Sequence, residues 1–354
     1  MRRLLFLVAM FLAGVVPVVA QQINYSQQLR LARSSYEQGR LHELGQFLKP
    51  QYFKGGFTKE EALQGYQYLT LAAIYLEEPA KADSLMLNIL RTDHYYEPNP
   101  KVDPAEYIAL YNTFRTKALW NAGIKFGVNG SFYNAIKNYY TLDGLQSKGV
   151  FKTKIGFQAG GVFQITPFVY SLNPTLRRFS FAPELMYQSR GATETATGPT
   201  VFLQNTFKLN WLDLNPVVTY RLSGDKSVNA LSTYVSFGPG VSYLLSAANT
   251  FVTTKNNGIG VVSGPDVIMT KSYKKLSYSL IASAGLKYKF GSIFLTAEIR
   301  AQYFLNNAVN PATRTNQDAA FNYGFTLDDY KINNLTGNIG FSIPYFNPKK
   351  KIKK

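Results

Sequence analysis

The C-terminal two-thirds of the chain contains eight segments in which apolar and polar residues alternate. In residues 151–165, Phe151, Ile155 and Phe157 fall on one parity, whereas Lys152 and Lys154 fall on the other. Successive side chains of a strand point to opposite faces, so such a segment has one apolar and one polar face. The segments lie near residues 121–133, 150–166, 178–191, 205–222, 231–247, 274–290, 292–304 and 332–346. The alternation therefore predicts eight antiparallel strands.

The apolar parity is kept along each predicted strand, for example at Ile124, Phe126 and Val128. Six tyrosines of this parity gather near strand ends, namely Tyr187, Tyr220, Tyr243, Tyr288, Tyr303 and Tyr345. Aromatic rings with a polar tip are typical of the interface between lipid and water. A closed barrel in a membrane has apolar residues outside and polar residues inside. We therefore expect a membrane barrel with these tyrosines at its interfaces.

The predicted connections alternate between long and short. The longest span residues 248–273 and 306–331, whereas the link around Gly291 is a tight turn. Outer-membrane barrels have long external loops and short periplasmic turns, and an even strand number brings both ends to the periplasm. The long loops are largely polar, which favours solvated loops and leaves an adhesive role as an alternative.

Residues 21–118 show the three-to-four spacing that is typical of helices. Thr58 followed by Glu61 is a capping box and predicts a helix from about residue 59 to 76. Pro79 opens the next predicted helix, and Ala72 and Ala73 supply small residues where two helices cross. The segment resembles a degenerate tetratricopeptide hairpin, although any helical hairpin needs small residues at its crossing.

The chain begins with a predicted secretion signal at residues 1–20: two basic residues, an apolar run, and Ala20 as the cleavage position. An uncleaved membrane anchor is the alternative. The net charge is +17, yet residues 21–118 carry 11 basic and 11 acidic residues, so the excess lies in the barrel segment and tail. We expect anionic lipid and lipopolysaccharide as partners and no nucleic acid. The basic tail, 347–354, is expected to be solvated and disordered.

The polar parity of the predicted strands carries charged residues, which argues against a soluble barrel with an apolar lumen. An eight-stranded barrel is only wide enough for its own side chains, and buried charges there must pair. We expect an interior network of Glu184, Arg190, Asp213, Arg221, Glu298 and Arg300. This network predicts that the charged side chains fill the barrel interior as a structural plug. A gated channel that prefers anions is the alternative, because inward-facing bases outnumber acids.

No enzyme signature stands out in the sequence. The only histidines, His42 and His94, lie in the helical segment, and the chain has no cysteine, so the barrel cannot hold a Ser-His-Asp or Cys-His site. No cluster with metal-ligand spacing and no phosphate-binding glycine loop is present. We therefore expect no cofactor, no metal and no enzymatic activity, with a site built from carboxylates alone as the alternative.

Four strand segments carry distinctive motifs. Residues 181–191 read FAPELMYQSRG, residues 211–218 read WLDLNPVV, residues 237–240 read FGPG and residues 284–288 read AGLKY. These motifs resemble the PorT-like family of outer-membrane barrels, although Asn215 is inserted before Pro216 relative to the family pattern. The resemblance covers residues 119–346 and implies an outer-membrane barrel. The extra Asn215 predicts a shift of register or a bulge.

The expected fold class is α+β with two domains, an eight-stranded antiparallel transmembrane barrel preceded by a small α-helical periplasmic domain. The expected boundaries are 1–20 for the signal, 21–118 for the helical domain, 119–346 for the barrel and 347–354 for the tail. The leading functional hypothesis is that the helical domain docks another envelope protein in secretion or outer-membrane assembly. The alternatives are a channel for small solutes and surface adhesion through the long loops.

Overall fold

The computed structural model describes residues 24–139, 150–198, 201–223, 231–255 and 260–351. The predicted secretion signal lies outside the described residues. The chain divides into two compact units. One contains the residues up to Thr116 together with those from Asn347 onward, and the other runs from Lys117 to Phe346. A helical region followed by an antiparallel barrel is therefore confirmed.

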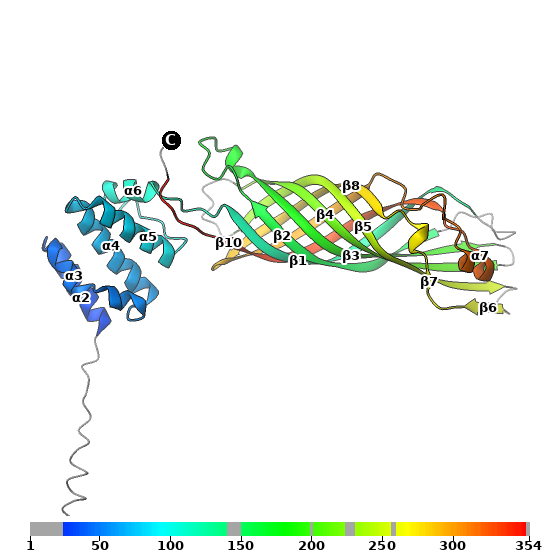
Figure 1. The fold of residues 1–354 in the computed structure, drawn as a ribbon, viewed down its shortest axis with the longest axis horizontal. Coiled ribbons are helices and arrows are strands. Elements are labelled where there is room, and N and C mark those ends of the chain that lie inside the picture. Colours follow the sequence, from blue (N-terminus) through cyan, green and yellow to red (C-terminus); the bar gives the residue numbers. More distant parts are fainter. Residues whose placement is uncertain (1–23, 140–149, 199–200, 224–230, 256–259, 352–354) are drawn as a thin grey trace, which may run out of the picture. The chain divides into compact units, whose positions relative to one another are not determined.

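The first unit is built from helices (Figure 1): α2 (Tyr25–Glu37), α3 (Leu44–Phe47), α4 (Lys59–Tyr75), α5 (Pro79–Thr92) and α6 (Ala105–Asn112). The predicted capping box is present, because Thr58 Oγ1 accepts from the Glu61 amide and the Glu61 carboxylate accepts from the Thr58 amide. Pro79 is the first residue of α5. Buried residues of α4, α5 and α6, including Met86, Ile89 and Tyr107, form one core cluster. Among the described residues, no helix is long and apolar enough to cross a membrane.

The tail belongs to the helical unit. Phe114 and Lys350 form an antiparallel bridge, and the Arg115 amide donates to the Lys349 carbonyl at 2.8 Å. Lys350 also pairs with Asp83 of α5, and the Lys351 amide donates to the Thr113 carbonyl. The side chains of residues 349–351 are exposed, as expected for a solvated tail. The expectation of disorder is wrong for these residues, because their backbone extends a small piece of antiparallel structure.

The second unit is a closed antiparallel barrel of eight long strands (Figure 1). The strands are β1 (Trp120–Lys137), β2 (Val150–Ile165), β3 (Phe179–Thr197), β4 (Val201–Arg221), β5 (Leu231–Lys255), β8 (Leu276–Phe290), β9 (Ile293–Phe304) and β10 (Asp329–Tyr345). Neighbours in sequence pair with one another, and β1 pairs with β10 to close the barrel. Short strands β6 (Gly260–Ser263) and β7 (Val267–Ile268) pair with β5, and helix α7 (Gln317–Tyr323) lies in the connection between β9 and β10.

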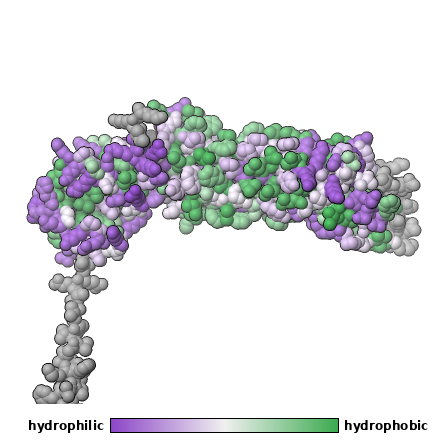
Figure 2. Space-filling view, in the orientation of Figure 1, coloured by the Kyte–Doolittle hydropathy of each residue, from purple (hydrophilic) through white to green (hydrophobic). Residues whose placement is uncertain are grey.

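The two faces of the barrel wall differ as the alternation predicts. Outward positions such as Phe126, Leu214 and Ile339 are exposed. The inward residues that precede them, Lys125, Asp213 and Asn338, are buried. Figure 2 shows hydrophobic residues over the middle of the barrel and hydrophilic residues towards the end that carries α7. An apolar outer wall and a polar interior are the arrangement of a membrane barrel.

The expected alternation fails at the beginning of β2. Phe151 packs against Tyr133 and Phe207 of the interior, with ring centroids 5.6 and 6.1 Å apart, and Lys152 and Lys154 are exposed instead. The pairing of β2 with β3 shifts register between Lys154 and Gln158. A bulge places two consecutive residues opposite one, so every side chain beyond it changes face. Sequence alternation alone does not reveal this bulge.

The extra residue Asn215 does not produce the expected bulge. β3 and β4 pair without a shift through Pro183–Pro216 and Glu184–Asn215. The register shift of β4 instead lies against β5, at Asn210 and Trp211. Asn215 points into the barrel and is buried, so it adds one polar group to the interior rather than an irregularity to the wall.

Candidate functional site: the charged layer and the apolar plug inside the barrel

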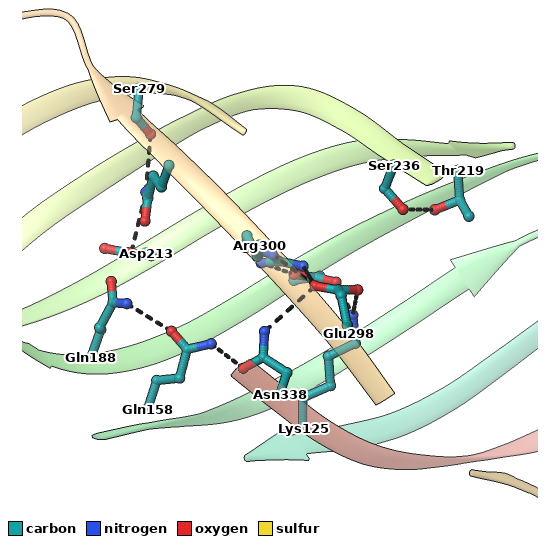
Figure 3. Close-up of polar contacts among 12 residues, drawn as sticks. Lys125, Gln158, Gln188, Asp213, Thr219, Ser236, Ser279, Glu298, Arg300 and Asn338 are labelled. Atoms are coloured by element: carbon teal, nitrogen blue, oxygen red, sulfur yellow. Dashed lines mark hydrogen bonds and ion pairs between the residues drawn. The ribbon is translucent and has the colours of Figure 1, made fainter. Parts of the chain in front are cut away.

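Four charged side chains from three strands meet in the barrel interior (Figure 3). Lys125 of β1 contacts Glu184 of β3 at 2.6 Å and Glu298 of β9 at 2.9 Å. Arg300, two residues beyond Glu298 on the same face, contacts Glu184 at 2.5 Å and Glu298 at 2.7 Å. All four are buried. Each carboxylate therefore has two cations, as ions removed from water require.

A second group of polar residues adjoins the first. Arg190 pairs with Asp213 at 2.5 Å and donates through Nε to Gln188 at 2.8 Å. Gln188 in turn donates to Gln158 at 2.7 Å, and Gln158 contacts Asn338 (Figure 3). Asn338 and Tyr234 both donate to Glu298, which connects the two groups. We call Lys125, Gln158, Glu184, Gln188, Arg190, Asp213, Glu298, Arg300 and Asn338 the charged layer.

The structure brings together five of the six residues of the predicted network. Arg221 is the last residue of β4 and lies outside the charged layer. The predicted network lacks Lys125, which has the inward parity of β1 and pairs with both Glu184 and Glu298. The layer holds three cations, Lys125, Arg190 and Arg300, and three carboxylates, Glu184, Asp213 and Glu298. This layer is therefore neutral as a whole.

Beyond the charged layer, the interior becomes an apolar plug. Phe207 and Trp211 of β4 and Phe251 of β5 are almost fully buried there, together with Tyr133 and Tyr330. The plug also contains residues of the two long connections, namely Met269, Tyr273, Ala308, Val309, Ala319, Tyr323, Phe325 and Leu327. The expectation of solvated loops is wrong for these buried residues, which fill the end of the barrel, whereas others in the same segments, such as Val261 and Phe321, are exposed.

Arg190 lies where the two layers meet. Its guanidinium is 4.6 Å from the centre of the Phe304 ring and 5.3 Å from that of Trp211. A planar cation between aromatic faces gains an electrostatic attraction in addition to its ion pair with Asp213. Arg190 thus anchors the charged layer to the apolar plug.

The six predicted interfacial tyrosines all lie on the outer wall. Tyr187, Leu212, Tyr243 and Leu276 form one continuous row across β3, β4, β5 and β8, and Tyr303 lies in β9 opposite Leu280. Tyr220, Tyr288 and Tyr345 lie close to the strand ends at the opposite rim, where Tyr345 stacks on Trp120 with ring centroids 4.5 Å apart. The tyrosines thus fall into two rows with apolar residues between them.

One buried carboxyl of the plug region predicts a pH dependence. Burial raises the pKa of Asp328 to about 6, and neighbouring Asp329 contributes in the same direction. Because this pKa exceeds the unfolded value of about 4, the folded state holds the proton more tightly. The free energy of unfolding should therefore rise as the pH falls from about 6 towards 4. Asp328→Asn should make this rise smaller in urea unfolding measured across that range.

Asp266→Asn is a matched control for that measurement. Hydrogen bonds from Lys208 and Thr250 lower the pKa of the exposed Asp266 carboxyl, so its contribution to stability changes with pH in the opposite direction. An unchanged rise between pH 6 and 4 in Asp328→Asn would show that Asp328 is not its source.

Buried ion pairs and packed aromatic rings fill successive parts of the described interior. Among the described residues, no three His, Cys, Asp or Glu side chains are placed to hold a metal ion. His42 and His94 both lie in the helical unit. The ion pairs and aromatic contacts of the interior can therefore hold the wall together and fix the loops.

Comparison with known proteins identifies the barrel. The family model described as "Outer membrane protein beta-barrel domain" matches residues 111–310. The chain belongs to this family. The match begins at the end of α6 and extends through β9. No curated protein sequence matches the chain.

Solved structures similar to this member of the family include Neisserial surface protein A, with 13% identity, 64% of this chain and 98% of that chain covered, and a TM-score of 0.31. Ail, the attachment invasion locus protein of Yersinia pestis, is 13% identical over 64% and 98% of the two chains, with a TM-score of 0.25. A major outer membrane protein from Thermus thermophilus is 11% identical over 63% and 99%, with a TM-score of 0.27.

Proposed function

We propose that this protein is a non-enzymatic transmembrane barrel of the outer membrane, whose helical unit docks another envelope protein in secretion or outer-membrane assembly. The observation that carries the proposal is the filled interior. Because a neutral layer of buried ion pairs and an apolar plug fill the interior, the barrel serves as an anchor rather than as a conduit. Partners would then bind to the outer surfaces or to the helical unit. That unit and the tail would lie in the periplasm.

The dimensions of the outer wall support the membrane placement. Tyr278 and Tyr288 are both outward residues of β8, exposed by 52% and 43%. They are separated by ten residues, which corresponds to about 25 Å along the barrel axis for a rise of about 3.4 Å per residue and a tilt of about 40°. The apolar band of an outer-membrane barrel is about 25 Å tall. The motifs near Glu184 and Trp211 favour a PorT-like member within the family.

The helical unit has exposed aromatic surface that fits a docking role. Tyr75, at the end of α4, is 51% exposed, and Leu31 of α2 is also exposed. Tyr36 and Tyr68 lie with ring centroids 5.4 Å apart and join the same two helices. Exposed aromatic side chains are enriched at the centres of protein interfaces. A tetratricopeptide-like hairpin is the form that we propose for α4 and α5.

A crosslinked pull-down from envelopes tests the docking proposal. Tyr75→Ala should reduce recovery of the partner by about tenfold, because removing an aromatic anchor of an interface commonly costs 1 kcal/mol or more. Phe321→Ala is the matched control, since Phe321 of α7 is 86% exposed and lies in a long connection of the barrel. Deletion of residues 21–118 together with 347–354 should abolish recovery.

Two outcomes would contradict the docking proposal. If Phe321→Ala loses the partner and Tyr75→Ala does not, surface adhesion through the long connections is the better explanation. The channel alternative is tested in planar bilayers, where the filled interior predicts no conductance step for the full chain. Steps of constant size would overturn the anchor proposal and favour a conduit for small solutes.

A further inference from the structure

We propose that a Ca²⁺ ion binds inside the barrel, at the end filled by the apolar plug, between the buried carboxyl groups of Glu194 and Asp328. Asn205 and Asn249 supply amide oxygens to the same site. We call these four residues the carboxyl–amide cluster. Binding of Ca²⁺ to this cluster would be independent of the docking function proposed above.

The strand register places three of these side chains next to one another. Glu194 of β3 lies directly opposite Asn205 of β4. Asn205 in turn lies opposite Phe251 of β5, and Asn249 precedes Phe251 by two residues on the same face. Side chains that lie opposite each other on one face have Cβ atoms about 5 Å apart. Glu194, Asn205 and Asn249 are 3%, 1% and 0% exposed, so all three are enclosed in the interior.

The end of the connection between β9 and β10 brings Asp328 to the same place. Within residues 325–330, the first ring lies 4.9 Å from that of Phe251 and the last lies 5.7 Å from that of Phe207. Phe251 and Phe207 are both neighbours of the β4 residue opposite Glu194. Asp328 lies between these two contacts and is 3% exposed. When both are charged, its carboxyl group repels that of Glu194.

Oxygen atoms of the cluster lack hydrogen-bond donors. In the part of the chain that the structure describes, Asn205 Oδ1, Asn249 Oδ1 and Asp328 Oδ2 are buried and accept no hydrogen bond. Asp328 Oδ1 accepts from the Tyr139 amide at 2.6 Å. Buried acceptors normally have a partner, and a bound ion is one way in which they are satisfied. Three such oxygens beside the Glu194 carboxylate are ligands of the kind that a hard cation takes.

The negative charge of the cluster is not neutralised by a basic residue. Among the described residues, neither Glu194 nor Asp328 forms an ion pair, whereas each carboxylate of the charged layer has a cation. Arg314 attracts Asp328, but it pairs with Asp329 at 3.3 Å and lies over the Tyr139 ring, 3.7 Å from its centre. Buried charges must be paired, and one divalent cation would neutralise both carboxylates.

The set of ligands fits calcium better than other metal ions. Ca²⁺ takes oxygen ligands from carboxylates, amides and backbone carbonyls in a flexible geometry. Mg²⁺ requires near-octahedral geometry and keeps several water molecules, for which the packed plug leaves little room. Zn²⁺ is bound mainly by His and Cys, which the barrel lacks. A bound Ca²⁺ would tie β3, β4 and β5 to the connection that contains residues 306–331.

Calorimetric titration of the full chain in detergent with calcium chloride tests the proposal. The unmodified protein should bind one Ca²⁺ ion. The double variant Glu194→Gln, Asp328→Asn should bind about 100-fold more weakly, because it removes both charges and keeps the shape of the side chains. It should fold without Ca²⁺, because the repulsion between the two carboxylates is also removed. The matched control is Asp266→Asn, Asp318→Asn, which removes the same charge from exposed positions of the two long connections and should bind normally.

Protease cleavage within residues 306–331 gives a second measurement. Ca²⁺ should slow it about tenfold relative to EDTA in the unmodified protein and in the control, and should not change it in the double variant. Faster migration of unboiled protein on a gel shows that each variant has folded. If the double variant does not fold, Asp328→Asn alone replaces it in both measurements and should bind Ca²⁺ about tenfold more weakly.

The proposal is overturned if the variant and the control bind Ca²⁺ equally. It is also overturned if the unmodified protein binds no Ca²⁺ at about 1 mM, because the carboxyl groups would then be held as acids or by water. An equal affinity for Mg²⁺ contradicts the choice of calcium. The pH dependence expected for Asp328 above applies to the metal-free protein, so it is measured in EDTA.

Discussion

Arg300→Met should destabilise the barrel by about 3–5 kcal/mol, the usual cost of breaking a buried ion pair. Arg300 contacts both Glu184 and Glu298, and its removal leaves Lys125 as the cation that both buried carboxylates share. The measurement is urea unfolding of the protein in lipid vesicles, followed by tryptophan fluorescence. A loss below about 1 kcal/mol would show that water enters the charged layer and replaces the guanidinium.

Two further variants are controls for the effect of Arg300→Met. Lys208→Met breaks an ion pair whose side chains are 51% and 45% exposed, so it should cost less than about 1 kcal/mol. The double variant Arg300→Met, Glu298→Gln removes one carboxylate together with the cation. It should recover part of the lost stability, because the main cost of the single change is the unpaired buried charge.

Phe207→Ala should cost about 3–5 kcal/mol, as expected for a large aromatic side chain removed from a packed core. Phe207 is fully buried, and its ring lies 5.3 Å from that of Tyr133 and 5.7 Å from that of Tyr330. The same unfolding measurement applies. Protease cleavage within residues 306–331 should also accelerate, because Tyr330 borders this connection and loses a packing partner.

Phe202→Ala is the control on the same strand. Phe202 points outward from β4 and is 37% exposed, so its loss should cost less than about 1 kcal/mol and leave cleavage unchanged. Equal effects of the two substitutions would mean that the plug does not hold the connections. Conductance should stay absent in Phe207→Ala, because the charged layer still fills the barrel below the plug.

Most of the barrel wall could be predicted from the sequence. Alternation is a property of each strand alone, so Ile124, Phe126 and Val128 of β1 reveal their face without knowledge of the neighbouring strands. The presence of ion pairs in the interior was also predictable. Charged residues that share an inward parity, such as Glu184, Glu298 and Arg300, must neutralise one another once they are buried. Arg221 shares that parity but lies at the end of β4, and parity carries no information on height along the barrel.

Other features depend on contacts that alternation does not contain. The change of face at Phe151 follows from a single register shift against β3, which reflects the pairing of two strands rather than the composition of one. The apolar residues of the connection that contains Tyr323, Phe325 and Leu327 are scattered among polar ones, and only the closed barrel gives them a common place to pack. The order of the tail was not predictable from its charge, because its lysines are exposed while its backbone pairs with residues 113–115.

The bridge between Phe114 and Lys350 completes the helical unit, and it should form readily only after the barrel has closed. These two residues are separated in sequence by the whole barrel, so bringing them together in an open chain carries a large loss of entropy. Once β1 and β10 have paired through Trp120 and Tyr345, the two bridge partners are each only a few residues from a fixed point. Their effective concentration then rises steeply. A partner that recognises the completed edge of the helical unit would therefore bind assembled molecules and pass over those whose barrel is still open.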